Sequence, residues 1–544
     1  MPQLTLTVLD TLGIQGYIFG SNRLRENIGA SHLVDQIASE WIREALPEPH
    51  NLGRSGELLT YPLEEHPEQQ AELIYRGGGN VVVLSRSEEA GRAIVRRLSS
   101  RLLEEAPGLE IAAAHVSFDW EREALGGAEG AHARVMEALN QAKQQRRPSA
   151  PLAGQAVTLA CRSTGLPAAG FDPNEKNLPL SAETLAKVNE LVADAAEKRL
   201  RQLLPAAVGD YALSRDFDHL GRSEGEMSYI AVVHADGNGI GTRLKVLAEQ
   251  YPEAAGNRAY IEALRGLSLS IERAGQTALR RTVERMLRSF VVPEPDDRLL
   301  TLLADINQNA SGGKPHLPFR PLVFGGDDVT FVCDGRLGLE LARIYLEEFE
   351  QAARDLPGGP AYACAGIAVV KAHYPFARAY ELSVELTREA KHALRQAGMQ
   401  GSALDWHFAV SGISGRLGEI RKREYEASEG LLGMRPVTLN GPGFDDWRSW
   451  EAFVTLVESF AGSDWAERRN KVIALRETLR AGKDATRHFR TAYSVAQLPP
   501  LPVDGTSSEY RETGWRDGRC VYFDAIEALD FYVPLAAELP QEED

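Results

Sequence analysis

Short apolar runs alternate with longer stretches of helical spacing between residues 226 and 410. The run from Tyr229 to Val233 is almost entirely apolar, which predicts a strand in the middle of a sheet. Helical spacing predicts one helix over about 257–290 and another, after a hairpin, over about 337–355. With a last strand at 361–370 the order is β-α-β-β-α-β, the ferredoxin-like split motif, which places the first strand beside the central hairpin.

The first 120 residues predict the same order of elements. A strand from Leu4 to Leu9 precedes a helical stretch that extends to about Ala45, and a hairpin over 72–84 follows. A helix over about 88–105 and a strand over about 109–118 complete the unit. The sequence therefore predicts two copies of one architecture within the chain.

The two predicted hairpins differ at their tips. The first tip is Gly77-Gly78-Gly79-Asn80, and the second is Gly325-Gly326-Asp327-Asp328. Glycine accepts the positive φ angles of tight hairpin turns, but two adjacent carboxylates repel each other. Mg²⁺ or Mn²⁺ would remove that repulsion, because both ions prefer carboxylate oxygens. An isolated Gly-Gly-Asp-Asp sequence would indicate a solvated acidic turn, so a metal site requires a further carboxylate.

Asp236 is the further carboxylate, because it ends the strand that is expected beside the second hairpin. Together with Asp327 and Asp328 it would hold two cations about 3.5–4 Å apart, as in phosphoryl-transfer sites. The following turn at 237–241 either brings backbone N–H groups to a triphosphate or simply joins a strand to a helix. No glutamate closes a twelve-residue loop here, which excludes a calcium loop.

The ordered motifs resemble those of the Cas10/Cmr2 family, the large subunits of type III CRISPR effectors and their CRISPR-polymerase-like relatives. The resemblance covers about residues 1–410. It is carried by Gly13-Ile-Gln-Gly-Tyr-Ile-Phe, Gly29-Ala-Ser-His-Leu, Ile74-Tyr-Arg-Gly-Gly-Gly-Asn, His234-Ala-Asp-Gly-Asn-Gly-Ile-Gly, Phe324-Gly-Gly-Asp-Asp-Val, Ala365-Gly-Ile-Ala, His373-Tyr-Pro-Phe and Arg388-Glu-Ala-Lys391.

The resemblance implies an α+β fold with two tandem ferredoxin-like palm (βαββαβ) domains. The expected divisions are a first palm domain with a metal-free hairpin at 1–120, a mainly helical linker region at 121–225, a second palm domain at 226–410 and a helical C-terminal domain at 411–544. Family members often carry an HD nuclease domain and a cysteine-based zinc module. We expect neither, because the chain starts at the first palm motif and its four cysteines show no Cys-x-x-Cys spacing.

The activity that the resemblance implies is nucleotidyl transfer in antiviral defence. NTPs, with ATP favoured, would be condensed into a cyclic or short oligonucleotide messenger, with pyrophosphate released. Asp236, Asp327 and Asp328 would be the catalytic residues and would hold two Mg²⁺ or Mn²⁺ ions. The palms would face each other, and nucleotides would contact Gly237, Asn238, Gly239, Gly325, Gly326 and Lys391 on the donor side and Gly78, Gly79, Asn80 and Ser31 on the acceptor side. Lys391 is equally consistent with a solvated helix lysine beside Glu389.

Composition narrows the setting of this activity. Four scattered cysteines, no membrane-length apolar run and no signal-peptide pattern predict a cytoplasmic protein. The net charge of −17 lowers the expectation of RNA binding, which relies on Lys and Arg displacing phosphate counterions. Lys143, Arg146 and Arg147 form the best basic candidate for an RNA contact, and a solvated helix end is the alternative.

The C-terminal region shows no candidate chemistry. Aromatic and apolar residues at helical spacing between Trp447 and Phe460 predict a buried helix face. The pair Asp445-Asp446 precedes this helix and predicts N-terminal capping rather than a second metal site.

Three alternatives remain at this stage. The chain could be a type III CRISPR subunit, activated by target RNA and bound to other effector subunits. It could be a GGDEF-type diguanylate cyclase, although Asp328 stands where that motif has glutamate and the tandem unit is foreign to that family. It could also be a scaffold without catalysis, but a scaffold has no need of three clustered carboxylates. A stand-alone synthase is the hypothesis we favour, and its oligomeric state is open.

Overall fold

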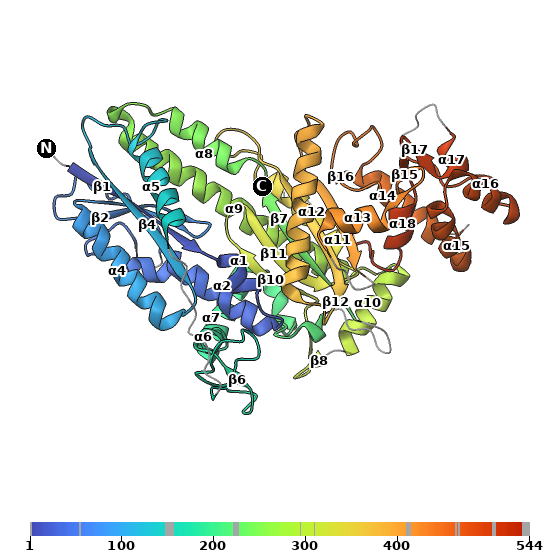
Figure 1. The fold of residues 1–544 in the computed structure, drawn as a ribbon, viewed down its shortest axis with the longest axis horizontal. Helices are drawn as coiled ribbons and strands as arrows, with labels where there is room; N and C mark the ends of the chain where they lie inside the picture. Colours follow the sequence, from blue (N-terminus) through green and yellow to red (C-terminus); the bar gives the residue numbers. More distant parts are fainter. Residues whose placement is uncertain are drawn as a thin grey trace.

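We describe the chain from a computed structural model that covers residues 3–53, 56–146, 157–220, 228–293, 295–308, 310–409, 415–462, 465, 468–502 and 508–535. The molecule is elongated (Figure 1): a four-stranded sheet lies near one end, a six-stranded sheet in the middle, and mainly helical C-terminal elements at the other end. The α+β class predicted from the sequence is confirmed.

The N-terminal sheet has the strand order β2-β3-β1-β4, with every neighbouring pair antiparallel. One face is covered by α2 and α4, and the other by α5 and the first turns of α9. The elements are β1 (Gln3–Leu12), α1 (Ile14–Phe19), α2 (Leu24–Gln36), the π-helix η1 (Ile37–Trp41), α3 (Ile42–Ala45), β2 (Ala71–Gly77), β3 (Asn80–Ser85), α4 (Glu88–Glu105), β4 (Glu110–Asp119) and α5 (Ala131–Gln145).

The segment after β4 is divided differently from the expected helical linker. Val135 and Leu139 of α5 are buried against the N-terminal sheet, because this helix has an apolar stripe that the sheet face covers. Two later helices of the segment, α6 (Ala182–Lys187) and α7 (Glu190–Leu203), pack on α2 instead, and short elements adjoin them. The short elements of the segment are β5 (Gly170–Phe171), β6 (Pro179–Leu180), and the 3-10 helices η2 (Ala206–Asp210) and η3 (Phe217–His219).

The central sheet has the strand order β10-β11-β7-β12-β13-β16 and is parallel only between β12 and β13. Helices α9 and α11 cover one face, while α12 covers the other together with α1 and α2 of the N-terminal unit. The elements are β7 (Tyr229–Gly237), α8 (Ile240–Glu249), η4 (Ala254–Gly256), α9 (Asn257–Ser289), α10 (Asp297–Gln308), β8 (Ala310–Ser311), β9 (Lys314–Pro315), β10 (Phe319–Phe324), β11 (Asp328–Asp334), α11 (Gly338–Ala352), β12 (Ala363–Lys371), α12 (Phe376–Gln396), β13 (Ala403–Ala409) and β16 (Val437–Thr438).

The C-terminal elements are mainly helical but include a small sheet of two-residue strands, which carry too little alternation to be predicted from sequence. The aromatic face at 447–460 is buried, as predicted. The capping prediction is wrong: Ser449 accepts the hydrogen bond from the Ala452 N–H, and Asp445 pairs with Arg448. The elements are α13 (Leu417–Glu424), β14 (Glu426–Ala427), β15 (Gly430–Leu431), α14 (Trp450–Ala461), α15 (Arg469–Arg480), α16 (Lys483–Ala492), α17 (Tyr510–Thr513), β17 (Trp515–Arg516), β18 (Arg519–Cys520) and α18 (Phe523–Ala528).

Helix α9 joins the two sheets, because its first half packs on the N-terminal sheet and its second half on the central one. Glu72 of β2 is fully buried and lies 2.6 Å from Arg258 and 2.8 Å from Arg265, both on α9. Burial alone would raise the pKa of Glu72, but the hydrogen bond and charge of Arg258 and the charge of Arg265 hold this pKa below its ordinary value. This ion cluster therefore ties the two units together.

The same helix passes very close to the hairpin between β10 and β11. A Cβ atom at Gly275 would overlap the carbonyl oxygen of Gly326, which lies at the hairpin tip. Helix and hairpin can approach this closely only because residue 275 has no side chain. The position of the tip is therefore fixed by α9 as well as by the sheet.

We expect replacement of Glu72 by Gln to lower the thermal midpoint at pH 7, by the equivalent of about 3 kcal/mol for a broken buried ion pair. Because the folded-state pKa of Glu72 is lowered, its stabilisation is present above the ordinary glutamate pKa and is lost as the pH falls through the lowered value. The difference between the two proteins should therefore shrink in acid, as thermal unfolding between pH 7 and pH 3.5 would show. An exposed control, Glu88→Gln, should have little effect at any pH.

Alanine at position 275 should separate α9 from the hairpin, although alanine favours helix over glycine by about 1 kcal/mol. We expect faster amide exchange at 323–329 and a lower thermal midpoint. Gly266 of the same helix is the matched control, because a Cβ atom there meets nothing within 4 Å. Gly266→Ala should be neutral or stabilising; equal behaviour of the two variants would contradict the close packing.

Candidate metal and nucleotide site

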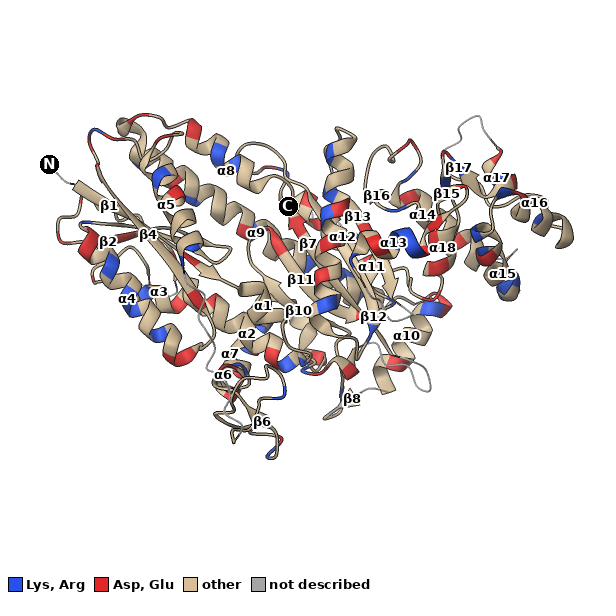
Figure 2. Cartoon of the chain, in the orientation of Figure 1, with Lys and Arg blue, Asp and Glu red and all other residues tan. Residues whose placement is uncertain are grey.

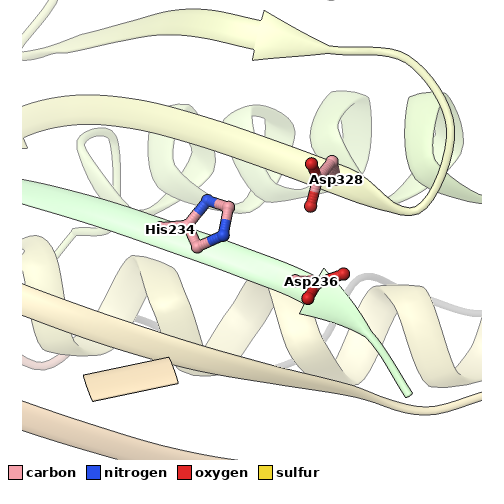
Figure 3. Close-up of side chains that lie close together, drawn as sticks. All are labelled: His234, Asp236 and Asp328. Carbon is pink, nitrogen blue, oxygen red and sulfur yellow. The ribbon is translucent and has the colours of Figure 1, made fainter. Parts of the chain in front are cut away.

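Two carboxylates face each other across neighbouring strands of the central sheet. Asp236 of β7 is the direct antiparallel partner of Asp328 of β11, and His234 is in the same way the partner of Thr330. Because alternate residues of a strand share a face, these four side chains lie on one face of the sheet. Figure 3 shows Asp236 and Asp328 beside the hairpin turn, with His234 further along β7. The predicted convergence of Asp236 and Asp328 is thus present in the structure.

Asp327 lies directly over the chain at Gly237. A Cβ atom added to Gly237 would be 2.8 Å from the Cβ atom and 3.0 Å from a carboxylate oxygen of Asp327. Gly325 and Gly326 adopt φ angles of 149° and 97°, which fold the hairpin so that consecutive aspartates meet β7. All three predicted carboxylates are therefore brought to one end of β7.

The electrostatics of this group disfavour three free negative charges. Desolvation by the surrounding protein, together with the charges of Asp236 and Asp327, raises the pKa of Asp328 to about 8. Burial and the charge of Asp236 also raise the pKa of Asp327. Asp328 nevertheless keeps a solvent-exposed side. A bound cation would offset this repulsion directly.

A group of side chains that could hold a metal ion is present at this point of the chain. Ligand atoms of His234, Asp236 and Asp328 lie within 4.8 Å of one another, the one such group of three found among the described residues. His234 was not predicted as a ligand, although His-x-Asp on one strand places both side chains on the same face. Burial lowers the pKa of His234 to about 4, so its imidazole is neutral at neutral pH, the form that binds metals.

Lys391 of α12 reaches the same group. Its ammonium lies 2.5 Å from a carboxylate oxygen of Asp236 and donates to the carbonyl oxygen of Gly237 at 2.7 Å. Lys391 is therefore beside the three carboxylates, and the alternative of a solvated helix lysine is wrong. In this structure its charge is directed at Asp236.

The turn after Asp236 starts a helix that the sequence pattern did not predict. Gly239 adopts the left-handed conformation and is followed at once by α8, in which no residue is buried. The side chain of Asn238 donates to the carbonyl oxygen of Gly401 at 3.0 Å and its N–H to that of Tyr362 at 2.7 Å. Asn238 thus holds the turn in place, so its backbone N–H is not available to a phosphate in this structure.

The N-terminal sheet repeats this geometry in detail. Asp10 is the antiparallel partner of Asn80, just as Asp236 is the partner of Asp328. Three residues after each aspartate stands a left-handed glycine, Gly13 or Gly239, at the start of a helix. Lys143 of α5 lies 2.6 Å from Asp10, as Lys391 does from Asp236. The N-terminal tip lacks carboxylates as predicted, but sequence reasoning missed Asp10, which the shared Asp-x-x-Gly spacing could have revealed.

The predicted acceptor residues fall into two places. Gly79 packs on Ile14 of α1 and accepts a hydrogen bond from the Thr11 N–H, and Gly78 and Asn80 adjoin it in the tip. Burial and the charge of Asp327 raise the pKa of the neighbouring Tyr75 hydroxyl to about 12. Tyr75, near the end of β2, is therefore within electrostatic range of Asp327.

Ser31 is engaged elsewhere. Its hydroxyl donates to the carbonyl oxygen of Leu322 and so joins α2 to β10. A nucleotide contact by Ser31 would require this hydrogen bond to be exchanged.

Two residues of the basic candidate for an RNA contact are paired with acidic residues of this chain. Lys143 is paired with Asp10, and Arg146 lies 2.5 Å from Glu110. Arg147 lies outside the described residues. Basic and acidic residues are interspersed over the helices in Figure 2, in keeping with this pairing. Among the described residues, no helix is long and apolar enough to cross a membrane.

Neither a protein-family model nor a curated protein matches the sequence. Solved structures do match at probability 1.00, each over nearly the whole chain. One is a Csm1–Csm4 cassette in complex with cA4, with TM-score 0.50, 13% identity, and 97% of this chain and 69% of that chain covered. The cassette with AMPPNP gives TM-score 0.51, 14% identity and coverages of 97% and 70%. The cassette with pppApApA gives 0.52, 13%, 98% and 70%.

These likenesses extend through both sheets and the C-terminal helices, although sequence identity is low. The resemblance to the Cas10/Cmr2 family that the motifs carry is thus confirmed in the fold: the chain shares its architecture with these Csm1–Csm4 cassette structures.

Proposed function

We propose that this protein is a metal-dependent nucleotidyltransferase that condenses ATP into a cyclic or short oligoadenylate, with release of pyrophosphate. The observation that carries the proposal is the placement of Asp236 opposite Asp328, with Asp327 beside them, at one end of β7. We interpret the two similar sheets as tandem palm domains, at 1–120 and 226–410, with 121–225 between them and 411–544 as the C-terminal domain. The second palm domain would carry the chemistry.

The donor set fits hard divalent cations. Oxygens of Asp236, Asp327 and Asp328 would hold two Mg²⁺ or Mn²⁺ ions, which when bound activate the acceptor hydroxyl and stabilise charge on the triphosphate. Lys391, once its partner Asp236 turns to a cation, would direct its ammonium at the triphosphate. The glycines at 237, 239, 325 and 326 would leave room for the phosphates close to the backbone. Positioning and charge stabilisation would carry the catalysis, so a separate protein base is unnecessary.

The acceptor nucleotide would lie against the N-terminal hairpin, at Gly78, Gly79 and Asn80. This placement is supported by the charge of Asp327, which acts on Tyr75 of the strand that leads into the N-terminal hairpin. It is supported as well by the repeated geometry, since Asp10 and Lys143 offer a neutral pair where the other unit has three carboxylates. Such a half could bind a nucleotide without binding a cation of its own.

Adenosine nucleotides are favoured as substrates because the matching cassettes were solved with cA4, AMPPNP and pppApApA. These ligands belong to the matching proteins, and only the shared fold connects them with this chain. The direct test is to incubate the purified protein with each NTP and with the four-NTP mixture, with Mg²⁺ or Mn²⁺, and to identify products by mass spectrometry.

We expect the wild type to form an adenylate oligomer or ring and Asp327→Asn/Asp328→Asn to form at least 100-fold less, because each variant side chain removes a charge from the cation site. Asp445→Asn/Asp446→Asn is the matched control: it removes the same charge from adjacent residues that both adopt positive φ, which Asn tolerates. Mn²⁺ binding, followed by electron paramagnetic resonance, should be lost only in the first variant. Mn²⁺ binding without product would point to a missing activator, and absence of both would overturn the proposal.

A second candidate function is that of a Cas10-like subunit in a type III CRISPR complex, with synthesis switched on by target RNA. The matching structures contain Csm4, which favours a protein partner for this chain too. Affinity purification of the tagged chain from its own cells should then recover a second subunit and guide RNA, and target RNA should increase product formation at least tenfold. Recovery of the chain alone, with full activity, would exclude this candidate and leave the stand-alone synthase.

A further inference from the structure

A buried arginine on β10 has no acidic partner among the residues that the structure describes. Arg320 is 2% exposed, and its Nε and Nη1 atoms have no hydrogen-bond partner within the described part of the chain. Another buried arginine, Arg435, lies 3.1 Å from Asp524. The partly exposed Arg336 lies 2.8 Å from Asp334 and 2.7 Å from Asp305. Leaving a buried charge unpaired is among the costliest arrangements in a protein interior. The structure therefore calls for a counter-charge beside Arg320.

A cavity of about 20 Å³ is lined by Arg320. Its other lining residues come from β10, from α2 of the N-terminal unit and from α7. The polar side chains on its wall are Ser31, His32, Arg199 and Arg320. His32 is also buried, and its Nδ1 atom lacks a partner among the described residues. Two unpartnered buried polar groups thus line one small space.

The charges around this cavity leave a positive excess. Arg199 is paired with Asp35 at 2.6 Å and lies over the ring of Phe324. The nearest acidic influence on Arg320 is Glu197, which is already paired with Arg201 and Arg215. Burial lowers the pKa of Arg320 to about 10, so the guanidinium is still charged at neutral pH. No described carboxylate is left to neutralise it.

We propose that the cavity binds one small monovalent anion of the size of chloride, held by Arg320, with His32 also lining the space. A space of about 10–15 Å³ admits a single water molecule, so 20 Å³ suits one atom-sized ion. The positive excess selects an anion over neutral water. This inference is independent of the proposed function, since the residues that line the cavity are not those of the carboxylate site.

The anion would stabilise the root of the hairpin that carries Asp327 and Asp328. Arg320 and Phe324 both belong to β10, which leads directly into Gly325. The hydroxyl of Ser31 donates to the carbonyl oxygen of Leu322 between them, so the cavity wall joins this strand to α2. Occupancy would therefore bind the two units together at the base of the hairpin.

The direct experiment is anomalous diffraction from a crystal of the full chain grown or soaked in sodium bromide. We expect a bromide peak within hydrogen-bond distance of the Arg320 guanidinium. In solution, the thermal midpoint of the wild type should rise by about 2–4 °C and saturate as chloride replaces gluconate at constant ionic strength. Arg320→Met should abolish this chloride dependence, whether the substitution itself raises or lowers the midpoint.

Arg336→Met is the matched control, because that guanidinium is fully paired with aspartates. Its midpoint should fall at every chloride concentration, with the chloride dependence of the wild type retained. A cavity with water density and no bromide peak, together with equal midpoints in chloride and gluconate, would overturn the proposal. Chloride dependence that persists in Arg320→Met would also overturn it, because another site would then be responsible.

Discussion

The register between β7 and β11 is the constraint on which the site depends, because it sets two carboxylates directly opposite each other. Like charges in a cross-strand pair destabilise a sheet, so the fold has to hold Asp236 and Asp328 together against their repulsion. Lys391 neutralises part of this charge at 2.5 Å from Asp236. The lack of side chains at Gly237 and Gly275 lets Asp327 and the hairpin tip approach from two other directions. A stability cost is thus concentrated where cations would bind, as expected of a functional site.

The N-terminal unit shows what the same geometry becomes when a charge is removed. Asp10 faces Asn80 instead of a second aspartate, and Lys143 then suffices to neutralise the single carboxylate. The two units therefore share backbone geometry and helix starts. They also share a lysine from the helix that follows β4 or β12, and they differ mainly in the side chains of the hairpin tip. This division fits a pair of half-sites in which one half holds cations and the other holds a nucleotide.

The sequence predicted the elements whose apolar pattern is determined within one segment, such as β7, α9, α11 and β12. It missed β13, although all seven residues are buried, because Asp405 and His407 interrupt the apolar pattern. Asp405 is satisfied by Arg421 of α13, a contact that no local pattern reveals. The three aspartates could be predicted because a strand end and a hairpin tip are local signals. The roles of Asp10, Lys143 and Gly275 could not, because each depends on which segments meet in space.

The Gly13-Ile-Gln motif also acts through tertiary contact rather than chemistry. Its left-handed glycine starts α1, which buries Phe19 against α12 of the other unit. The ring of Phe19 stacks on Tyr380 at 3.7 Å, and Tyr380 meets His234 edge-on at 5.7 Å. His234 in turn lies with Asp236 and Asp328 in the candidate metal site. A displacement of the N-terminal unit would therefore reach His234, beside the carboxylate pair, through three packed rings.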